Sequence, residues 1–485
     1  MAKSFTIKLK NGRGVKETKL ACEERYLLVE VREKLRAASF TSAEVYKKGQ
    51  SRPIFKLTPK ILSAPLIISI IGTGYVGLVT GVGLCHRGKK VLCVDVDQKK
   101  VETINRRETP IYEKGLKEML CSLPARQFSC TTDMKEAVLK SDATFIAVGT
   151  PPMDNGDQCL DHIRAVSIEL GKILKHKPGH LVVVKSTVIP GTTQNVVKRL
   201  IAENAGHSKF RVAMVPEFLR EGLALEDFLN PARIIIGVEY NEDFEDIKFI
   251  FKEFKTSFFK TAVASAEMIK YASNAMLATK ITFANEIGNI CKHQGIDVYE
   301  VMDGVGLDPR IGRAFLNAGR GFGGSCFPKD VKALMHLGRK IRQPATLLEA
   351  VWQVNERQPL KLVELAKKRV GILKGKQVAV MGLAFKPGTD DVRESPATIV
   401  IQELLRQGAQ VLAYDPVASE NMAKLFPNIE YGKTPQKVID KADVVIGVTE
   451  WPELRDEKLY EGKVFIDGMK FLNKKTGKDY EGICW

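Results

Sequence analysis

A glycine-rich decapeptide gives one cysteine of the chain a chemical context: Gly-Phe-Gly-Gly-Ser-Cys-Phe-Pro-Lys-Asp at residues 321–330. Glycine lets a backbone approach a ligand closely and adopt positive φ, so Cys326 can occupy a tight, accessible loop. A helix that begins near Pro328 would place Cys326 just ahead of an N-terminus, where the dipole favours a thiolate. Asp330 would lie about one turn further on, close enough to handle a proton or a water. The same residues also describe a glycine turn beside a buried structural cysteine.

A second glycine pattern predicts a dinucleotide site. The apolar run Leu66–Ile71 meets Gly-Thr-Gly-Tyr-Val-Gly at 72–77, then a helical stretch, then a strand that ends at Asp95. Strand, G-x-G-x-x-G, helix and a downstream acid form the dinucleotide fingerprint, in which the pyrophosphate approaches the helix N-terminus. Asp95 would accept hydrogen bonds from the adenosine ribose, which favours NAD over NADP. The alternative is a glycine-rich turn without a cofactor. The candidate cofactor residues here are Gly72, Gly74, Tyr75, Val76, Gly77, Asp95 and Lys100.

More strand–helix units follow, and polar residues come after their strands. Strands are expected at 143–148, 180–184 and 211–215, with 233–238 closing the series. Ligands of open α/β sheets bind beyond the carboxyl ends of the strands. Four side chains are expected on that rim, although each alone would be an ordinary cap or turn residue: Thr150, Thr187, Glu217 and Glu221.

The next segment changes to an alanine-rich pattern that predicts a long helix over Ala262–Cys291. Lys270 and Asn274 are four residues apart and therefore share a helix face. Their apolar neighbours (Met268, Ile269, Tyr271, Met276 and Leu277) indicate a largely buried helix. We therefore expect a desolvated lysine aimed at a ligand, and a helical centre that can carry a dimer interface.

A second α/β pattern starts at Lys376. Strands are expected at 377–381, 410–414, 443–448 and 464–467, with a helix from Ser395. The full G-x-G-x-x-G is absent, which fits a nucleotide-like ligand other than NAD. The fold class is therefore α/β, with two Rossmann-like doubly wound domains joined by a long central helical region. The expected domains are a basic appendage of α+β or partly ordered character (1–65), an NAD-binding domain (66–260), a helical domain with the cysteine loop (261–370) and a third domain (371–485).

Composition narrows the class of protein. The chain has 485 residues and a formal net charge of +17, and residues 1–65 carry 15 Lys and Arg against 6 Glu. Basic charge without aromatic interleaving or a known module does not indicate nucleic-acid binding. The nine cysteines contain no Cys-x-x-Cys and the seven histidines no His-Glu-x-x-His, so no metal is expected. No apolar run approaches the roughly 20 residues of a membrane span, and no signal peptide pattern opens the sequence; a cytoplasmic protein is expected.

From Leu66 onward the chain resembles the UDP-glucose/GDP-mannose dehydrogenase family. The cysteine decapeptide at 321–330 carries the most specific part of the resemblance. The segments Pro-Ile-Tyr-Glu at 110–113 and Asp-Pro-Arg-Ile-Gly at 308–312 look closer to members that use UDP-glucose than to those that use GDP-mannose. The resemblance implies a four-electron oxidation of UDP-glucose to UDP-glucuronate with two NAD, in a homodimer or larger homo-oligomer.

By the same resemblance, Cys326 adds to the aldehyde and later forms a thioester, which water cleaves. Lys270 and Asn274 would stabilise the oxyanion, Asp330 and Lys270 would share acid–base work, Thr150 would assist through a water, and Glu217 would serve thioester hydrolysis. Arg393 and Glu221 would lie near the nicotinamide, and Thr150 and Thr187 would also contact the cofactor. The implied substrate-binding residues are Glu217, Phe218, Leu219, Arg220, Lys270, Asn274, Arg310 (from across a subunit interface), Asn317, Gly319, Gly321, Phe322, Gly323, Phe385 and Lys386.

The chain departs from the family pattern at Val215, Lys114 and Met469, where asparagine, proline and arginine are common. The missing arginine puts a sugar or phosphate contact in doubt, unless Lys470 compensates. Three alternatives stay open: GDP-mannose or another nucleotide sugar as substrate, a two-electron β-hydroxyacid dehydrogenase, and a basic nucleic-acid-binding protein. The cysteine loop and the second α/β domain argue against the β-hydroxyacid reaction, which needs neither.

Overall fold

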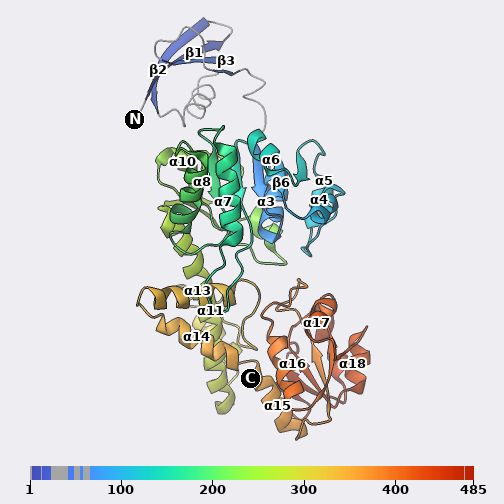
Figure 1. Cartoon of the computed structure of the whole chain (residues 1–485). Coiled ribbons are helices and arrows are strands. Elements are labelled where there is room, and N and C mark those ends of the chain that lie inside the picture. The colour runs from blue at the N-terminus through green and yellow to red at the C-terminus, as the bar shows by residue number, and fades with distance from the viewer. Residues whose placement is uncertain (1–2, 12–13, 23–41, 48–54, 58–65, 475) are drawn as a thin grey trace. The chain divides into compact units, whose positions relative to one another are not determined.

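The structure is a computed structural model that describes residues 3–11, 14–22, 42–47, 55–57, 66–474 and 476–485. The chain divides into two compact units. Figure 1 colours the chain by residue number, from blue at the N-terminus to red at the C-terminus. The first unit comprises Met1–Thr150 with Cys159–Lys270, and the second Pro151–Gln158 with Tyr271–Trp485. In the part of the chain that is described, no helix has the length and apolar character needed to cross a bilayer.

The N-terminal segment contains a four-stranded antiparallel sheet in the order β2-β1-β3-β4. Its strands are β1 (Lys3–Asn11), β2 (Gly14–Cys22), β3 (Ser42–Lys47) and β4 (Phe55–Leu57). The alternating residues 4–10 predict an extended segment, and β1 confirms this, with Ile7 buried. The amphipathic pattern of residues 26–38 predicts a helix, and these residues lie outside the described ranges.

The first unit also holds an eight-stranded sheet, in the order β12-β11-β10-β9-β8-β5-β6-β7. Six strands, β7 to β10 through β6, β5, β8 and β9, are parallel and follow the Rossmann order; β11 runs antiparallel to β10. The strands are β5 (Ile67–Ile71), β6 (Lys90–Val94), β7 (Phe128–Thr131), β8 (Ala143–Ile146), β9 (Leu181–Val184), β10 (Arg211–Met214), β11 (Arg233–Gly237) and β12 (Ser257–Thr261).

Two of these strands are absent from the sequence prediction. The expectation that the strand at 233–238 closes the series is wrong, because β12 follows it and pairs with it in parallel. Both β12 and β7 lie at edges of the sheet, and their side chains are partly exposed. Neither strand therefore has the continuous apolar run that marks a strand buried on both faces.

Helices cover both faces of this sheet, because α3 packs into one apolar cluster (through Leu78 and Val82) and α7 into another (through Ile163 and Leu170). The helices are α3 (Tyr75–His86), α4 (Gln98–Asn105), α5 (Leu116–Ser122), α6 (Met134–Lys140), α7 (Asp161–Leu174), the π-helix η1 (Thr193–Lys198), α8 (Arg199–Ala205), α9 (Ala224–Leu229) and α10 (Asn241–Ile250).

A helix of 32 residues, α11 (Val263–Gln294), confirms the predicted long central helix. The surroundings of Lys270 are predicted to be largely buried. Tyr271 is buried, but Met268 and Met276 are 40% and 60% exposed, so the prediction is wrong for these two methionines. The reason is the helical period, which turns the two methionines to another side of the helix. The following helices are α12 (Val298–Gly306), α13 (Phe327–Lys340), α14 (Thr346–Arg357) and α15 (Leu360–Val370).

A six-stranded parallel sheet completes the second unit, in the order β15-β14-β13-β16-β17-β18. Figure 1 shows α16 and α18 on opposite sides of it. The strands are β13 (Gln377–Met381), β14 (Gln410–Tyr414), β15 (Glu430–Tyr431), β16 (Val444–Gly447), β17 (Val464–Asp467) and β18 (Tyr480–Gly482), and the helices are α16 (Pro396–Arg406), α17 (Ser419–Leu425), α18 (Pro435–Lys441) and the short 3-10 turns η2 (Pro452–Arg455) and η3 (Glu457–Tyr460). The four predicted strands are present, whereas the two-residue β15 and the edge strand β18 were not predicted.

Candidate active site

The three glycines of the motif after β5 have different structural roles. Gly72 has φ +96° and packs so close to the end of β8 that an added Cβ would lie 2.8 Å from the Ala147 carbonyl oxygen. Gly77 lies on α3 against the strand, where an added Cβ would be 1.8 Å from the Gly72 carbonyl oxygen. Gly74 is the N-cap of α3, and an added Cβ there would meet nothing within 4 Å. The glycines thus bring a helix N-terminus to open space, which fits a pyrophosphate.

Asp95 follows β6 and fixes this turn. Its carboxylate accepts hydrogen bonds from the Thr73 amide (2.9 Å), the Thr73 hydroxyl (2.5 Å) and the Asp97 amide (3.1 Å). Burial alone would raise the pKa of Asp95, but these donors and Lys100 hold it below its ordinary value. The half-buried carboxylate stays ionised and partly exposed, which suits a group that accepts hydrogen bonds from ribose.

The rim residues after β8 and β9 lie together. The hydroxyl of Thr150, a buried side chain, donates to the Thr187 carbonyl oxygen at 2.9 Å. Glu221 lies in the turn before α9, half-buried. The structure therefore brings Thr150 and Thr187 to one edge of the sheet, as predicted from the parallel arrangement.

Glu217 and Lys270 form a buried ion pair within the first unit, with Oε1 to Nζ at 2.9 Å. They are 6% and 3% exposed. The second carboxylate oxygen accepts from the Leu219 amide at 2.6 Å, and the Phe218 ring lies 5.4 Å from the Lys270 ammonium. Burial would raise the pKa of Glu217, but Lys270, the Leu219 amide and Lys185 hold it below its ordinary value. Glu217 is thus a buried carboxylate that its neighbours keep ionised.

Cys326 is the N-cap of α13, and Pro328 lies in the first turn, as the sequence predicts. The thiol is partly exposed, and the Ser325 hydroxyl lies 3.6 Å from its sulfur. Gly324 has φ +86°, and an added Cβ there would lie 2.6 Å from the Phe385 ring. The loop therefore presents Cys326 at a helix N-terminus, where the partial positive charge favours the thiolate.

Asp330 lies inside the first turn of α13 and is 1% exposed. Its carboxylate accepts from the Asn274 amide at 2.6 Å and from the Lys329 ammonium at 2.5 Å. Asn274 lies on α11 one turn beyond Lys270. Asn274, Asp330 and Cys326 are thus brought together within the second unit, and α11 presents Lys270 and Asn274 in succession.

The loop before Cys326 is held by side chains distant in sequence. Asn285 accepts from the Gly319 amide (2.7 Å), and Gln358 donates to the Gly319 carbonyl (2.8 Å). Asn355 bonds both backbone groups of Phe322, at 2.8 and 3.0 Å. Gly321 (φ +95°) packs on Asn355, and Gly323 packs on the Glu394 carbonyl. These contacts hold the buried backbone of residues 318–324 in one conformation ahead of Cys326.

The remaining predicted residues are more exposed. Arg220, Arg310 and Arg393 are exposed, and their guanidinium groups pair with Asp227, Asp308 and Asp391, each at 2.6 Å. Asn317 is also exposed, while Phe385 and Lys386 are half-buried, with the Lys386 ammonium 5.5 Å from the Phe385 ring.

Lys470, the candidate replacement for the missing arginine, already has interactions within the protein. Its ammonium pairs with Asp297 at 3.1 Å and lies 4.2 Å from the Tyr299 ring. Met469 instead packs against the loop, because an added Cβ at Gly319 would lie 2.4 Å from its sulfur. An apolar side chain thus lies beside a predicted substrate residue.

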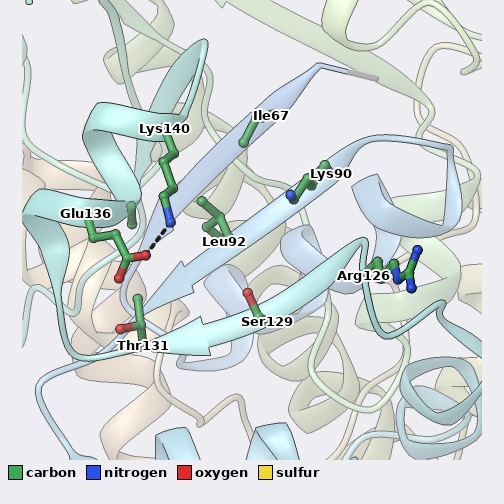
Figure 2. A pocket seen from close by; sticks show the side chains of 9 residues that line it. Ile67, Lys90, Leu92, Arg126, Ser129, Thr131, Glu136 and Lys140 are labelled. Atoms are coloured by element: carbon green, nitrogen blue, oxygen red, sulfur yellow. Dashed lines mark hydrogen bonds and ion pairs between the residues drawn. The ribbon is translucent and has the colours of Figure 1, made fainter. Parts of the chain in front are cut away.

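A cavity of about 340 Å³ lies elsewhere on the first unit (Figure 2). Its lining includes Ile67 and Lys90, the first residues of β5 and β6, with Ser129 on β7 and the Glu136–Lys140 pair on α6. The dinucleotide turn is at the other, carboxyl end of β5, so this cavity is not the dinucleotide site. Among the residues that are described, no group of three or more His, Cys, Asp and Glu is placed to hold a metal ion.

Sequence reasoning missed Lys185, Asn285, Gln358 and Asn355. Lys185 follows β9 directly, at the same strand-end position that singled out Thr150 and Glu217, so the rule that found those residues could have found it. Asn285 lies in α11, Asn355 lies in α14 and Gln358 is the C-cap of α14. All three are far from the loop in sequence, and no local pattern reveals their contacts.

The Rossmann sheet with its glycine turn and acid, joined to a helical segment with a cysteine at a helix N-terminus, defines an NAD-dependent dehydrogenase. Three domains of the UDP-glucose/GDP-mannose dehydrogenase family match the chain: the NAD binding domain at residues 66–255, the central domain at 264–357 and the UDP binding domain at 379–474. The chain belongs to this family, which confirms the predicted fold class and the NAD cofactor.

The relatives are similar over most of their length. UDP-glucose 6-dehydrogenase AglM of Haloferax volcanii is 43% identical, over 86% of this chain and 99% of the relative, and TuaD of Bacillus subtilis is 41% identical, over 84% and 89%. A UDP-glucose dehydrogenase structure from Pyrobaculum islandicum is 43% identical with a TM-score of 0.84, covering 87% of this chain and 98% of the other. A GDP-mannose dehydrogenase from Pseudomonas aeruginosa is 36% identical with a TM-score of 0.50, covering 86% and 100%.

Proposed function

We propose that this protein oxidises the C6 alcohol of UDP-glucose to the carboxylate of UDP-glucuronate through a thioester on Cys326. The observation that carries the thioester route is the partly exposed Cys326 at the start of α13. Asp330 lies in the first turn of the same helix and accepts a hydrogen bond from Asn274 of α11. A dehydrogenase that stopped at the aldehyde would need no such thiol. The relatives named UDP-glucose 6-dehydrogenase support the substrate.

The glycine turn at residues 72–77 and Asp95 would hold NAD, which would supply the hydride acceptor for both oxidations at C6. In the first oxidation, Lys270 and Asp330 share the removal of the hydroxyl proton, and Asn274 donates a hydrogen bond to the forming carbonyl oxygen. The Cys326 thiolate then adds to the aldehyde carbon, and the alkoxide that results takes up a proton. Loss of this proton and of the second hydride leaves the thioester carbonyl on Cys326.

Hydrolysis completes the reaction. Glu217, held ionised by Lys270, removes a proton from a water that attacks the thioester carbonyl, with Thr150 orienting this water. The carbon–sulfur bond breaks, and Cys326 leaves as the thiolate. The net yield is one carboxylate and two reduced cofactors per sugar.

The first test counts NADH per sugar. With UDP-glucose the intact protein should form two NADH per molecule consumed, and Cys326→Ala should form at most one, because the reaction stops at the aldehyde. One NADH per sugar from the intact protein would rule out the thioester route. GDP-mannose is the matched control: faster turnover with it would move the proposal to the second candidate substrate, which the Pseudomonas aeruginosa relative represents.

We also propose a homodimer in which a second copy covers α11. Met276, Phe283 and Ile290 are 60%, 49% and 57% exposed and stand seven residues apart on this helix. A seven-residue apolar repeat is the pattern of a helix–helix seam. Arg310, exposed in one chain, would reach the partner's site. Phe283→Glu should therefore give a monomer in sedimentation velocity, while Leu425→Glu, an exposed leucine on α17, should leave the dimer intact.

We place the protein in the cytoplasm. All eight cysteines whose side chains are described are free thiols, which fits a reducing compartment. A tagged protein found with a periplasmic or secreted marker after fractionation would contradict this location.

A further inference from the structure

Lys185 is a buried lysine outside the mechanism above. It follows β9 directly, is 4% exposed, and its amide donates to the Ile146 carbonyl at 2.8 Å. Within the described ranges, no hydrogen bond or ion pair reaches its Nζ atom. Burying an ammonium group is costly unless nearby charge compensates it, so the charges that surround Lys185 decide what it does.

The sheet brings Lys185 next to Glu217. Strands β9 and β10 are parallel neighbours with Val184 opposite Met214, and the Val215 amide donates to the Val184 carbonyl at 2.9 Å. Lys185 and Glu217 therefore leave adjacent strands at the same edge. With Lys270, which pairs with Glu217 at 2.9 Å, they form a group of three buried charges.

This group has one carboxylate for two amines, so it carries one net positive charge when both amines are protonated. Burial lowers the pKa of Lys185 to about 8, against the attraction of Glu217 and with the repulsion of Lys270. The group therefore changes its net charge close to physiological pH. Conversely, Lys185 helps to hold the pKa of Glu217 below its ordinary value, although burial alone would raise it.

We propose that Lys185 is a positioning residue for thioester hydrolysis: a second buried cation that keeps Glu217 ionised beside Lys270. This role rests on the proposed function of Glu217. A lysine that merely filled space could be replaced by a neutral side chain of similar length without moving any titration. The charge of Lys185, rather than its volume, is what the role requires.

Two variants separate charge from volume. Lys185→Met keeps the length and removes the cation, so the pKa of Glu217 rises and the acid limb of the kcat–pH profile moves to higher pH by about one unit or more. At a fixed pH on that acid limb, turnover should fall about tenfold or more. The KM for UDP-glucose should change less than about threefold, and the Cys326 thioester should accumulate in intact-mass spectra at that pH. Lys185→Arg keeps the cation, and its guanidinium does not titrate below about pH 12. The acid limb of the kcat–pH profile should therefore stay where it is in the wild type, and any limb of that profile near pH 8 should disappear.

The outcomes distinguish a lysine that acts through its charge from one that only fills space. A Lys185→Met enzyme with the wild-type acid limb and no accumulated thioester overturns the proposal. If that variant does not fold, a Lys185→Arg enzyme that retains a limb near pH 8 overturns it, because that limb then belongs to another group. Failure of the proposed function would look different: the unmodified protein would itself form only one NADH per sugar, whatever residue stands at 185.

Discussion

The eight-stranded and six-stranded sheets of this protein have similar strand-end turns, but the acid after the second strand has different surroundings in each sheet. Each has a glycine with positive φ after its first strand (Gly72, +96°; Gly382, +83°) and an aspartate after its second (Asp95, Asp415). In both, the aspartate accepts hydrogen bonds from amides of the glycine turn. The difference lies in what else reaches the carboxylate.

The Asp415 carboxylate is buried, whereas the Asp95 carboxylate is partly exposed to solvent. The Asp415 carboxylate accepts from the Leu383, Ala384, Val417 and Ala418 amides and from the Trp451 indole, at 2.7 to 3.0 Å, and its side chain is buried. Asp95 accepts from Thr73 and Asp97 and keeps an exposed edge. The helix start also differs, since α3 begins three residues beyond Gly72 and α16 only at Pro396. We therefore expect an acid after the second strand to bind ribose only where a glycine turn opens a helix beside it.

The largest difference is expected when each acid is removed. Asp415→Ala leaves up to five buried N–H donors without a partner and should lower the free energy of unfolding by about 4 kcal/mol, measured by urea denaturation. The KM for NAD of the folded enzyme should stay within about twofold. Asp95→Ala should do the reverse, with a loss of stability below about 1 kcal/mol and a KM for NAD raised tenfold or more. Equal effects of the two changes on the KM for NAD would contradict the comparison.

Substitutions at Gly77 and Gly74, in the turn after β5, should also have different effects, one on stability and the other on NAD binding. Gly77→Ala forces a Cβ to 1.8 Å from a backbone oxygen, and overpacking of this kind should cost about 3 kcal/mol, seen as a lower melting temperature. At Gly74 the side-chain direction is open, so Gly74→Ala should cost no more than about 1 kcal/mol. The same variant should weaken NAD binding in a fluorescence titration, because the methyl group occupies the space for the pyrophosphate. Unchanged NAD affinity would remove Gly74 from the cofactor site.

A smaller effect should appear with pH. The folded protein holds the pKa of Asp95 below its ordinary value, so the ionised carboxylate adds stability above the unfolded pKa of about 3.9, and this is lost as pH falls through the lower folded pKa. Solvent screening limits the gain to less than about 1 kcal/mol. The difference in unfolding free energy between the wild type and Asp95→Asn should therefore shrink as pH falls from 6 to 3. A difference that grows in that range would show the opposite sign of the shift.

The smallest effect is expected at the cavity of Figure 2. Lys140 and Glu136 are an exposed pair four residues apart on α6, and such pairs contribute about 0.3–0.5 kcal/mol. Lys140→Ala should change stability by no more than this and leave both KM values unchanged. A raised KM for either substrate would mean that this face takes part in binding.

The sequence predicts local features well. The glycine turn with Asp95, the start of α13 at Cys326 and the long helix with Lys270 and Asn274 each depend on residues within a few turns of one another. The same local rules explain the errors: Met268 and Met276 were read from apolar composition rather than from the helical period, and the edge strands β7 and β12 lack a continuous apolar run.

Other features depend on contacts that no local pattern contains. The bonds of Asn285, Gln358 and Asn355 to the loop before Cys326 join residues about 33 to 39 positions apart. The hydrogen bond from the Trp451 indole to the Asp415 carboxylate joins residues 36 positions apart. The Lys185–Glu217–Lys270 group exists only because β9, β10 and α11 bring three separate segments together.

The measurement that tests the central claim most directly is the mass of Cys326 during turnover. Glu217→Gln, mixed with NAD and UDP-glucose, removes the base for hydrolysis while it leaves Cys326 and Asp330 in place. The account predicts one covalent UDP-glucuronyl adduct per chain, mapped to Cys326 by peptide analysis, with a burst of two NADH per adduct. Two NADH formed per sugar without any adduct on Cys326, or an adduct on another residue, would contradict the account.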